Sequence, residues 1–477
     1  MATLSGTITP SFKSGTAFSW IATGYLISNA ACQPLSGKLT DIYGRRAGLV
    51  VALLLFTTGT LLCGFANNAA TMIAGRVIAG MGGGCLNTIS TFVLSDLVPL
   101  KDRGVWQGIG SIIYGAGTGL GGIFGGFVHE KMHWSYAFII QVPFIVLAGT
   151  CSVVFLRIPP KDKDLVNIKR VDFLGAVTLV TSLSLLMIGL NSGGNTVPWS
   201  HPLVYSSLIA GVVFLALFVM IEDRISIEPV IPVRLLLNQG VAAACLTCWF
   251  NTMAMFSLLF FIPIYFNVVV GLSAAQAGSL FVPQAIGTAV GSLGTGIIMS
   301  RTGRYYWLHQ GTQCLMVFAS AVILITFGTS VSAKTPFICL ALAGISYGSM
   351  LTIVLIALIS AVDYKWHAVI TSASFAFRST GSSIGISVCS AIFQTKINQE
   401  LFDHFGGLLD AENIINRIRD SVDEIQNAPV EWHSGIVESY VEALRGVWVA
   451  VLLFTILAAG ASMFLKGQPL HRKSSGK

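Results

Sequence analysis

The chain has 477 residues, of which 54% are hydrophobic and only 10% are charged, with a formal net charge of +7 and a mean hydropathy of +0.76. Soluble domains carry about 25% charged residues, so this composition excludes a water-exposed globule of this length. It predicts a polytopic membrane protein.

Apolar runs long enough to cross a bilayer recur along the whole chain. A membrane-spanning helix needs about 20 mostly apolar residues. Thirteen runs approach or exceed that length, at approximately 15 to 36, 48 to 66, 71 to 97, 104 to 127, 136 to 156, 172 to 192, 203 to 221, 240 to 268, 276 to 299, 306 to 328, 336 to 362, 368 to 394 and 446 to 465. They are too long for barrel strands and lack their alternation, and their many glycines suit closely packed helices. The sequence therefore predicts an all-α fold.

Lys and Arg gather in alternate connections between these runs. Nineteen of the 28 lie in one set of connections, which the positive-inside rule assigns to the cytosol together with the C-terminus. Thirteen spans then place Met1 on the opposite face, although no cleavable signal precedes the first run. We expect that a helix before Met1 has been lost, through an incomplete start or a genuinely shortened gene. The alternative is that one span is misassigned.

A charged segment between the first two runs, SGKLTDIYGRR, has an echo in the second half of the chain. Gly37 and Gly44 correspond to Gly296 and Gly303 of GIIMSRTGR, an offset of 259 residues. The stretches 80 to 84 and 344 to 348 also correspond, each with a glycine at both ends. A repeat of this size predicts two similar helical bundles with a substrate site between them near the midplane.

The repeat divides the chain into four parts. We expect a first bundle at 1–156, a linker at 157–239 with two inserted helices, a second bundle at 240–465 and a cytosolic tail at 466–477. The second bundle includes a polar loop at 396–445, placed in the lumen by the charge pattern. Within that loop, Ile414, Ile415, Ile418, Val422 and Ile425 follow Asp410 at helical spacing and predict an amphipathic helix.

The motif between the first two runs resembles a known pattern. Its residues match the G-x-L-x-D-x-x-G-R-[RK] loop of the major facilitator superfamily, at Gly37, Leu39, Asp41, Gly44, Arg45 and Arg46. The two inserted spans make the chain similar to the fourteen-helix drug:proton antiporter branch. WIATGYLI, QPLSGKL and AGRVIAGMGGGC are similar to fungal vacuolar basic amino acid transporters. The resemblance implies two pseudo-repeated bundles plus two linker helices, with the family's first helix absent.

The resemblance also assigns the cytosolic motif the role of a conformational latch. Asp41 and Arg45 match the latch residues, and Asp96 lies at a helix end from which it could join them. A carboxylate there can face a helix N-terminus and bond an arginine in only one state of a rocking motion. These charges also serve as positive-inside anchors, Arg46 above all. In the second half the loop carries Gly296, Arg301, Gly303 and Arg304, with Ser300 in place of Asp41.

Two arginines fall inside spans. A buried arginine costs about 2.5 to 3.5 kcal/mol on insertion scales, so it must be paired or face an aqueous cavity. For Arg76 we favour a cavity or coupling role over a tie to backbone carbonyls, and Arg378 either lines the cavity or extends its head to the cytosolic interface. The glycines predicted to let helices pack closely are Gly80, Gly84, Gly121, Gly122, Gly125 and Gly126.

The leading functional prediction is proton-coupled antiport of lysine, histidine and arginine from the cytosol into the vacuole. A plasma-membrane multidrug:proton exporter is the first alternative, and a nontransporting sensor or degenerate paralogue is the second. No nucleotide loop, zinc spacing or nucleophile triad supports a pump or an enzyme. The CxxC of Cys245 and Cys248 has no accompanying histidine or second pair, so we expect no metal and no cofactor.

The expected partners follow from this function. They are a small-molecule substrate, either a basic amino acid or a drug-like cation, together with protons and the lipid bilayer. We expect a monomer that binds no nucleic acid. The vacuolar membrane is the expected location and the plasma membrane is the alternative, and both rest on the resemblance.

Overall fold

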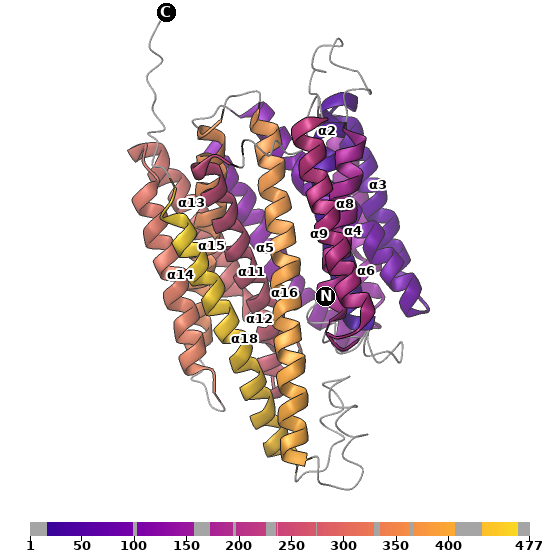
Figure 1. Ribbon diagram of the computed structural model, residues 1–477, viewed down its shortest axis with the longest axis vertical. Coiled ribbons are helices and arrows are strands. Elements are labelled where there is room, and N and C mark those ends of the chain that lie inside the picture. The colour runs from indigo at the N-terminus through magenta and orange to yellow at the C-terminus, as the bar shows by residue number, and fades with distance from the viewer. Residues whose placement is uncertain are drawn as a thin grey trace, which may run out of the picture.

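The computed structural model describes residues 17–98, 103–156, 172–193, 197–225, 235, 237–272, 274–328, 334–362, 366–405 and 432–465. Long helices fill these ranges and run roughly alongside one another (Figure 1). In the described residues, nine helices are long and apolar enough to cross a membrane. The predicted all-α membrane fold is confirmed.

The described part of the first bundle contains six helical segments. They are α2 (Ala17–Tyr43), α3 (Arg45–Gly64), α4 (Ala69–Leu97), α5 (Arg103–Lys131), α6 (Tyr136–Ile139) and α7 (Gln141–Phe155). The inserted pair follows as α8 (Phe173–Ser192) and α9 (Pro202–Arg224). The second bundle contains α11 (Gln239–Val268), α12 (Ala274–Ser279), α13 (Phe281–Thr302), α14 (Tyr306–Thr326), α15 (Lys334–Ser360), α16 (His367–Phe405) and α18 (His433–Ser462).

Each of the thirteen predicted runs coincides with a helix or with a broken pair of helices. The two breaks, between α6 and α7 and between α12 and α13, have the same position relative to a proline. Pro143 and Pro283 are each the third residue of the second segment. Because proline has no N–H, neither can bond to the carbonyl four residues earlier, which belongs to the preceding segment. Each span is therefore interrupted one turn before its proline.

Helices α16 and α18 extend beyond the apolar runs, so the predicted loop at 396–445 is helical at both ends. At their shared end the rings of Phe405 and Trp432 stack with centroids 4.2 Å apart, and His404 lies 4.0 Å from Glu438. These contacts let two helices continue as a pair after their sequences become polar. The predicted amphipathic helix behind Asp410 lies outside the described residues.

Equivalent glycines bring equivalent helices together in the two bundles. A Cβ added to Gly84 of α4 would lie 2.4 Å from the Asn29 carbonyl oxygen of α2, and one added to Gly80 would reach the same helix. In the second bundle, a Cβ added to Gly348 of α15 would meet the Thr288 carbonyl oxygen of α13 in the same way. Helix α4 therefore packs on α2 as α15 packs on α13, with backbones too close for any side chain.

Both loop motifs place a glycine at a positive φ angle. Gly44, between α2 and α3, has a φ of 88°, and Gly303, between α13 and α14, has a φ of 65°. Both values lie where side chains other than glycine are disfavoured, which explains the glycine before arginine in both copies.

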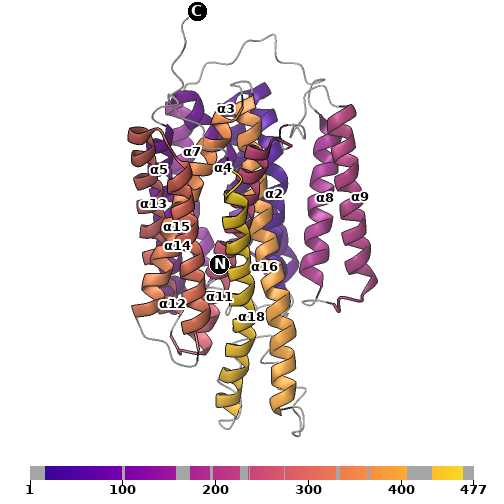
Figure 2. The ribbon, with the colours of Figure 1, turned by 60° about the vertical axis from the view of Figure 1, so that its left-hand side comes forward.

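The two bundles meet along two seams. Helix α2 packs against α16 at one seam, and α5 packs against α13 at the other. The two seams are equivalent, because the repeat pairs α2 with α13 and α5 with α16. The inserted α8 covers the first seam because it contacts both α2 and α16, and α8 and α9 stand together on that side (Figure 2). A small apolar cluster holds the pair in place, formed by Ala176, Leu179, Phe218 and Ala373 with Leu35.

Candidate functional site

A cavity of about 510 Å³ lies between the two bundles. Its wall is built from α2, α4 and α5 on one side and from α11, α15 and α16 on the other. The residues that line it are Tyr25, Leu26, Asn29, Gln33, Asn87, Ser90, Thr91, Leu94, Trp106, Ile109, Gly110, Ile113, Tyr114, Thr252, Phe256, Tyr347, Leu351, Phe375, Arg378, Ser379 and Ser382. The size and the mixed aromatic and polar lining suit a small organic molecule.

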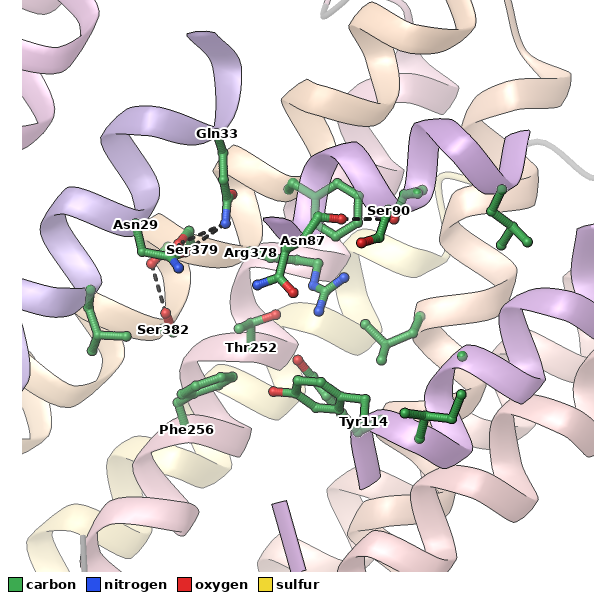
Figure 3. A pocket seen from close by; sticks show the side chains of 18 of the residues that line it. Asn29, Gln33, Asn87, Ser90, Tyr114, Thr252, Phe256, Arg378, Ser379 and Ser382 are labelled. Carbon is green, nitrogen blue, oxygen red and sulfur yellow. Dashed lines mark hydrogen bonds between the residues drawn. The ribbon is translucent and has the colours of Figure 1, made fainter. Parts of the chain in front are cut away.

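Arg378 of α16 supplies the charge in this lining, which contains no Asp or Glu among the described residues. Its guanidinium points into the cavity between Asn87 and Thr252, with Tyr114 on the other side (Figure 3). The guanidinium carbon lies 4.9 Å from the centre of the Phe375 ring, a distance at which the ring face attracts a cation. Its Nε is buried and has no hydrogen-bond partner in the described part of the chain. Arg378 therefore lies in the cavity wall and keeps a donor available.

A polar network joins the bundles beside Arg378. Asn29 Oδ1 accepts hydrogen bonds from Gln33 Nε2 at 2.7 Å and from Ser379 Oγ at 3.0 Å (Figure 3). Because Asn29 and Gln33 belong to α2 and Ser379 to α16, the bond to Ser379 crosses one seam. A rocking motion that separates α2 from α16 would break this contact.

Arg76, the other arginine within a span, does not line this cavity. Its Nε donates to the Ile21 carbonyl oxygen at 3.3 Å, and its guanidinium carbon lies 4.2 Å from the centre of the Tyr25 ring. Tyr25 in turn lines the cavity. Tyr25 therefore separates Arg76 from the cavity. Arg76 makes the contact with a backbone carbonyl that we considered the less favoured alternative, and its role in coupling stays a prediction.

The proposed latch contains one well-defined ion pair within the first bundle. Arg45 Nε lies 3.1 Å from Asp96 Oδ2, and Arg45 Nη1 donates to Thr40 Oγ1 at 2.7 Å. The Arg45 side chain is only 5% exposed and that of Asp96 is 22% exposed. Arg45 also lies over the Phe92 ring at 4.8 Å. The structure thus brings Asp96 to Arg45, whereas the side chain of Asp41 lies outside what the structure describes.

The remaining candidates differ in their surroundings. Arg46, Arg301 and Arg304 are exposed, and among the described residues neither Arg301 nor Arg304 has a carboxylate within 4 Å. Gly37 and Gly296 are buried at matching positions of α2 and α13.

The α5 glycines only partly fit their predicted packing role. A Cβ at Gly121 would meet no atom within 4 Å, so this glycine makes no close helix contact. Its side of α5 is exposed, and the close approach to α13 occurs instead at Gly108, where a Cβ would lie 2.9 Å from Leu293 Cα. Gly125 is buried, and nothing is described of the surroundings of Gly122 and Gly126.

Sequence reasoning missed most of the cavity wall. Tyr25, Asn29, Gln33 and Tyr347 are polar groups inside apolar runs, and that is the signal which could have indicated them. In the described residues, no group of three or more His, Cys, Asp or Glu side chains is placed to hold a metal ion.

The Major Facilitator Superfamily model matches residues 1–386. The chain belongs to this superfamily. It is therefore a multi-pass membrane transporter for small molecules, as its fold and its central cavity also indicate.

Two curated relatives from Schizosaccharomyces pombe cover nearly the whole chain. The multidrug resistance protein fnx1 is 35% identical over 99% of this chain and 90% of its own length. The vacuolar membrane amino acid uptake transporter fnx2 is 31% identical over 95% of this chain and 78% of its own length. Among solved structures, the human organic anion transporter MFSD10 matches with a TM-score of 0.61 over 94% of this chain and 84% of its own, at 13% identity, which supports the fold alone.

Proposed function

We propose that this transporter moves basic amino acids from the cytosol into the vacuole by alternating access, in exchange for protons. The observation that carries the substrate class is Arg378. It is the charged group of the cavity lining, and no acidic residue accompanies it among the lining residues described. A solute that binds there gains most by bringing its own carboxylate.

The energetics favour a carboxylate over a bare cation. Hydrogen bonds to charged groups contribute about 1.5 to 3 kcal/mol each, and a guanidinium can engage a carboxylate with two parallel bonds. A cation without a carboxylate would instead meet repulsion from Arg378 in a site with reduced dielectric screening. An amino acid satisfies Arg378 with its α-carboxylate whatever its side chain carries.

The opposite wall of the cavity offers acceptors for the amino groups of such a substrate. Asn87 and Ser90 of α4 present a carbonyl and a hydroxyl oxygen. The rings of Tyr25 and Phe256 add aromatic faces that attract ammonium groups. A zwitterion with a second cationic end can therefore span the cavity from Arg378 to α4.

Multidrug export is the second candidate. It is favoured by the printed name of fnx1, the relative with 35% identity, and by the aromatic share of the cavity lining. The printed name of fnx2 favours amino acids as substrates. We prefer amino acids to drugs because Arg378 places a positive charge in the cavity wall.

The substrate test compares two diamines that differ only in the carboxylate. Purified protein in liposomes with an acidic interior is offered radiolabelled lysine or cadaverine, which is lysine without its carboxyl group. We expect lysine to be preferred by about 10- to 100-fold, the ratio that corresponds to one charge-assisted contact. Equal uptake of cadaverine, or export of ethidium without any lysine transport, would overturn the amino acid proposal. If none of the three moves, the nontransporting alternative gains support.

Substitutions at the cavity sharpen this test. Arg378→Gln is expected to abolish the preference for lysine, and Arg378→Lys to lower lysine uptake by about tenfold because a point charge replaces the planar fork. Arg445→Gln is the matched control, because Arg445 is exposed in the first half of α18, outside the cavity lining, and pairs with Glu442 there. Vacuoles isolated with and without the gene, and with an uncoupler, test the location and the proton coupling.

The latch is part of the same proposal. We expect Asp41→Asn to reduce transport while membrane insertion stays normal, since a carboxylate at this end of α2 would contact the other bundle in one state only. Unchanged transport by this variant would remove Asp41 from the mechanism.

A further inference from the structure

A second polar site lies inside the second bundle, separate from the cavity. Asn251 Nδ2 of α11 donates to Gln313 Oε1 of α14 at 2.6 Å, and both side chains are buried. His309 lies one turn before Gln313 on α14 and is completely buried. Residues four apart share one face of a helix, so His309 and Gln313 present a continuous polar strip toward the bundle interior.

Four polar atoms of this cluster have no hydrogen-bond partner among the described residues. They are Asn251 Oδ1, Gln313 Nε2, and both ring nitrogens of His309. Each buried polar atom left unpaired costs about 1 to 3 kcal/mol, so four at one place would cost a large fraction of a protein's stability. Ordered water supplies such partners where donors and acceptors converge. The cluster therefore has the composition of a hydrated site.

The titratable group of this cluster is the imidazole of His309. Helix α14 packs against α15 and α18 and bonds to α11 through Gln313. The charged residues on these helices are Lys334 at the start of α15 and Glu438, Glu442 and Arg445 in the opposite half of α18, with His433 at its first turn. The other titratable side chains on these helices are the thiols and phenols of Cys245, Cys248, Tyr265, Tyr306, Cys314, Cys339, Tyr347 and Tyr440. An imidazole ordinarily titrates between pH 5 and 8.

The cluster also adjoins the substrate wall. Thr252, the residue after Asn251, lines the cavity, and so does Tyr347 of α15. Helix α11 thus has the cavity at Thr252 and the buried cluster at Asn251. A charge that forms on His309, behind α11, can change the relative free energies of two conformations, one in which α11 faces water and one in which it packs against the other bundle.

We propose that His309, hydrated together with Gln313 and Asn251, binds and releases the coupled proton of the transport cycle. A ring nitrogen accepts a proton from the water of the cluster and forms the imidazolium, and no other bond is made or broken. The charged ring favours the conformation in which the cluster reaches bulk water, and the neutral ring favours the closed one. This inference rests on the proposed proton coupling, but its atoms are distinct from those that select the substrate.

The transport test separates coupling from substrate movement. His309→Gln is expected to keep lysine exchange between equal pools within about twofold of wild type, because exchange needs no net proton transfer. Accumulation driven by a pH gradient is expected to fall at least about tenfold and to lose its pH dependence. His404→Gln, at the exposed end of α16, is the control and should retain both activities. If His309→Gln keeps gradient-driven accumulation with the wild-type pH profile, the proposal is wrong.

A spectroscopic test does not depend on the substrate. Full-length protein labelled with [15N]histidine is placed in liposomes, and solid-state nitrogen NMR follows its eight histidines from pH 5 to 8. The spectrum of His309→Gln, or of His309→Asn if the first variant does not fold, assigns the His309 resonance. We expect that ring to change from neutral to imidazolium in this range and to exchange magnetisation with water.

The two tests fail in different ways. A His309 ring that stays neutral and dry from pH 5 to 8 overturns the proton site even if lysine is transported. A ring that titrates and contacts water in a protein that moves no lysine supports the proton site and overturns the proposed substrate.

Discussion

The two bundles share a packing plan but differ in the depth of their cores. Among the described residues, one continuous apolar cluster extends through the second bundle, whereas two small clusters, around Met72 and around Leu49, lie in the first bundle. Two helices contribute most to the larger cluster: α15, with 18 of 27 residues buried, and α11, with 18 of 30. The described part of the first bundle has no helix that corresponds to α11 in the repeat, and α7 buries none of its residues.

This comparison separates two contributions to a membrane bundle. The close contact of α4 with α2 and of α15 with α13 depends on glycines and is present in both bundles. A central helix that fills the space among the others is described in the second bundle only. We therefore expect a given disturbance of the shared contact to cost more in the second bundle, where the surrounding side chains have less room to move.

The largest expected effect comes from adding a methyl group at the shared helix contact. Gly348→Ala places a Cβ 2.0 Å from the Thr288 carbonyl oxygen and should lower the free energy of unfolding by about 3 kcal/mol. Gly84→Ala, 2.4 Å from the Asn29 carbonyl oxygen, should cost about 1 to 2 kcal/mol because the first bundle can yield.

Thermal unfolding of the purified variants measures this difference. Gly121→Ala is the control, because its Cβ meets no atom within 4 Å, and its melting temperature should equal or slightly exceed that of wild type. If Gly84→Ala and Gly348→Ala lose equal free energies of unfolding, the deeper core of the second bundle does not restrict how its helices adjust to the added methyl group.

The second prediction uses the charges of the repeated loops, which are paired differently in the two copies. Arg45→Gln should destabilise the protein by about 1 to 3 kcal/mol, between the values for exposed and buried ion pairs, because it removes contacts with Asp96 and Thr40. Asp96→Asn should cost less, since Arg45 keeps its bond to Thr40 and its contact with Phe92.

Arg304→Gln in the second copy serves as the comparison. Arg304 is exposed, so this change should shift stability by less than about 0.5 kcal/mol. Thermal unfolding at low and high salt checks both substitutions, because the contacts of a side chain that is 5% exposed should persist at high salt. A loss at Arg304 as large as that at Arg45 would contradict the asymmetry of the two loops.

Hydropathy predicted the helices well because a chain in lipid must satisfy its backbone hydrogen bonds within each span. It could not predict which arginine faces the cavity. Arg76 and Arg378 are both single charges in apolar runs, and only the rotation of each helix, which packing sets, places one against Tyr25 and the other in the cavity. Asn29 and His309 were missed because neutral polar side chains within a span have no periodic pattern that distinguishes a functional site from a packed core.

The smallest expected effects come from the two turn glycines, and they test whether the repeated loops are equivalent in detail. Gly303 has φ 65° and ψ 10°, close to the left-handed helical region that asparagine tolerates. Gly44 has φ 88° and ψ 150°, near a region that is essentially restricted to glycine. The two residues occupy the same position in the motif but adopt different backbone conformations.

Asparagine should therefore distinguish the two glycines, although alanine disfavours both. Gly303→Asn is expected to cost a few tenths of a kcal/mol and Gly303→Ala about 1 kcal/mol, whereas at Gly44 asparagine should give no advantage over alanine and both should cost about 1 kcal/mol or more. No atom lies within 4 Å of a Cβ at Gly44, so any loss there reports backbone strain and not a clash. Melting temperatures of the four variants decide the matter. A rescue by asparagine at Gly44 as complete as at Gly303 would show that the two loops share one conformation, and the distinction between the two copies would then rest on their charges alone.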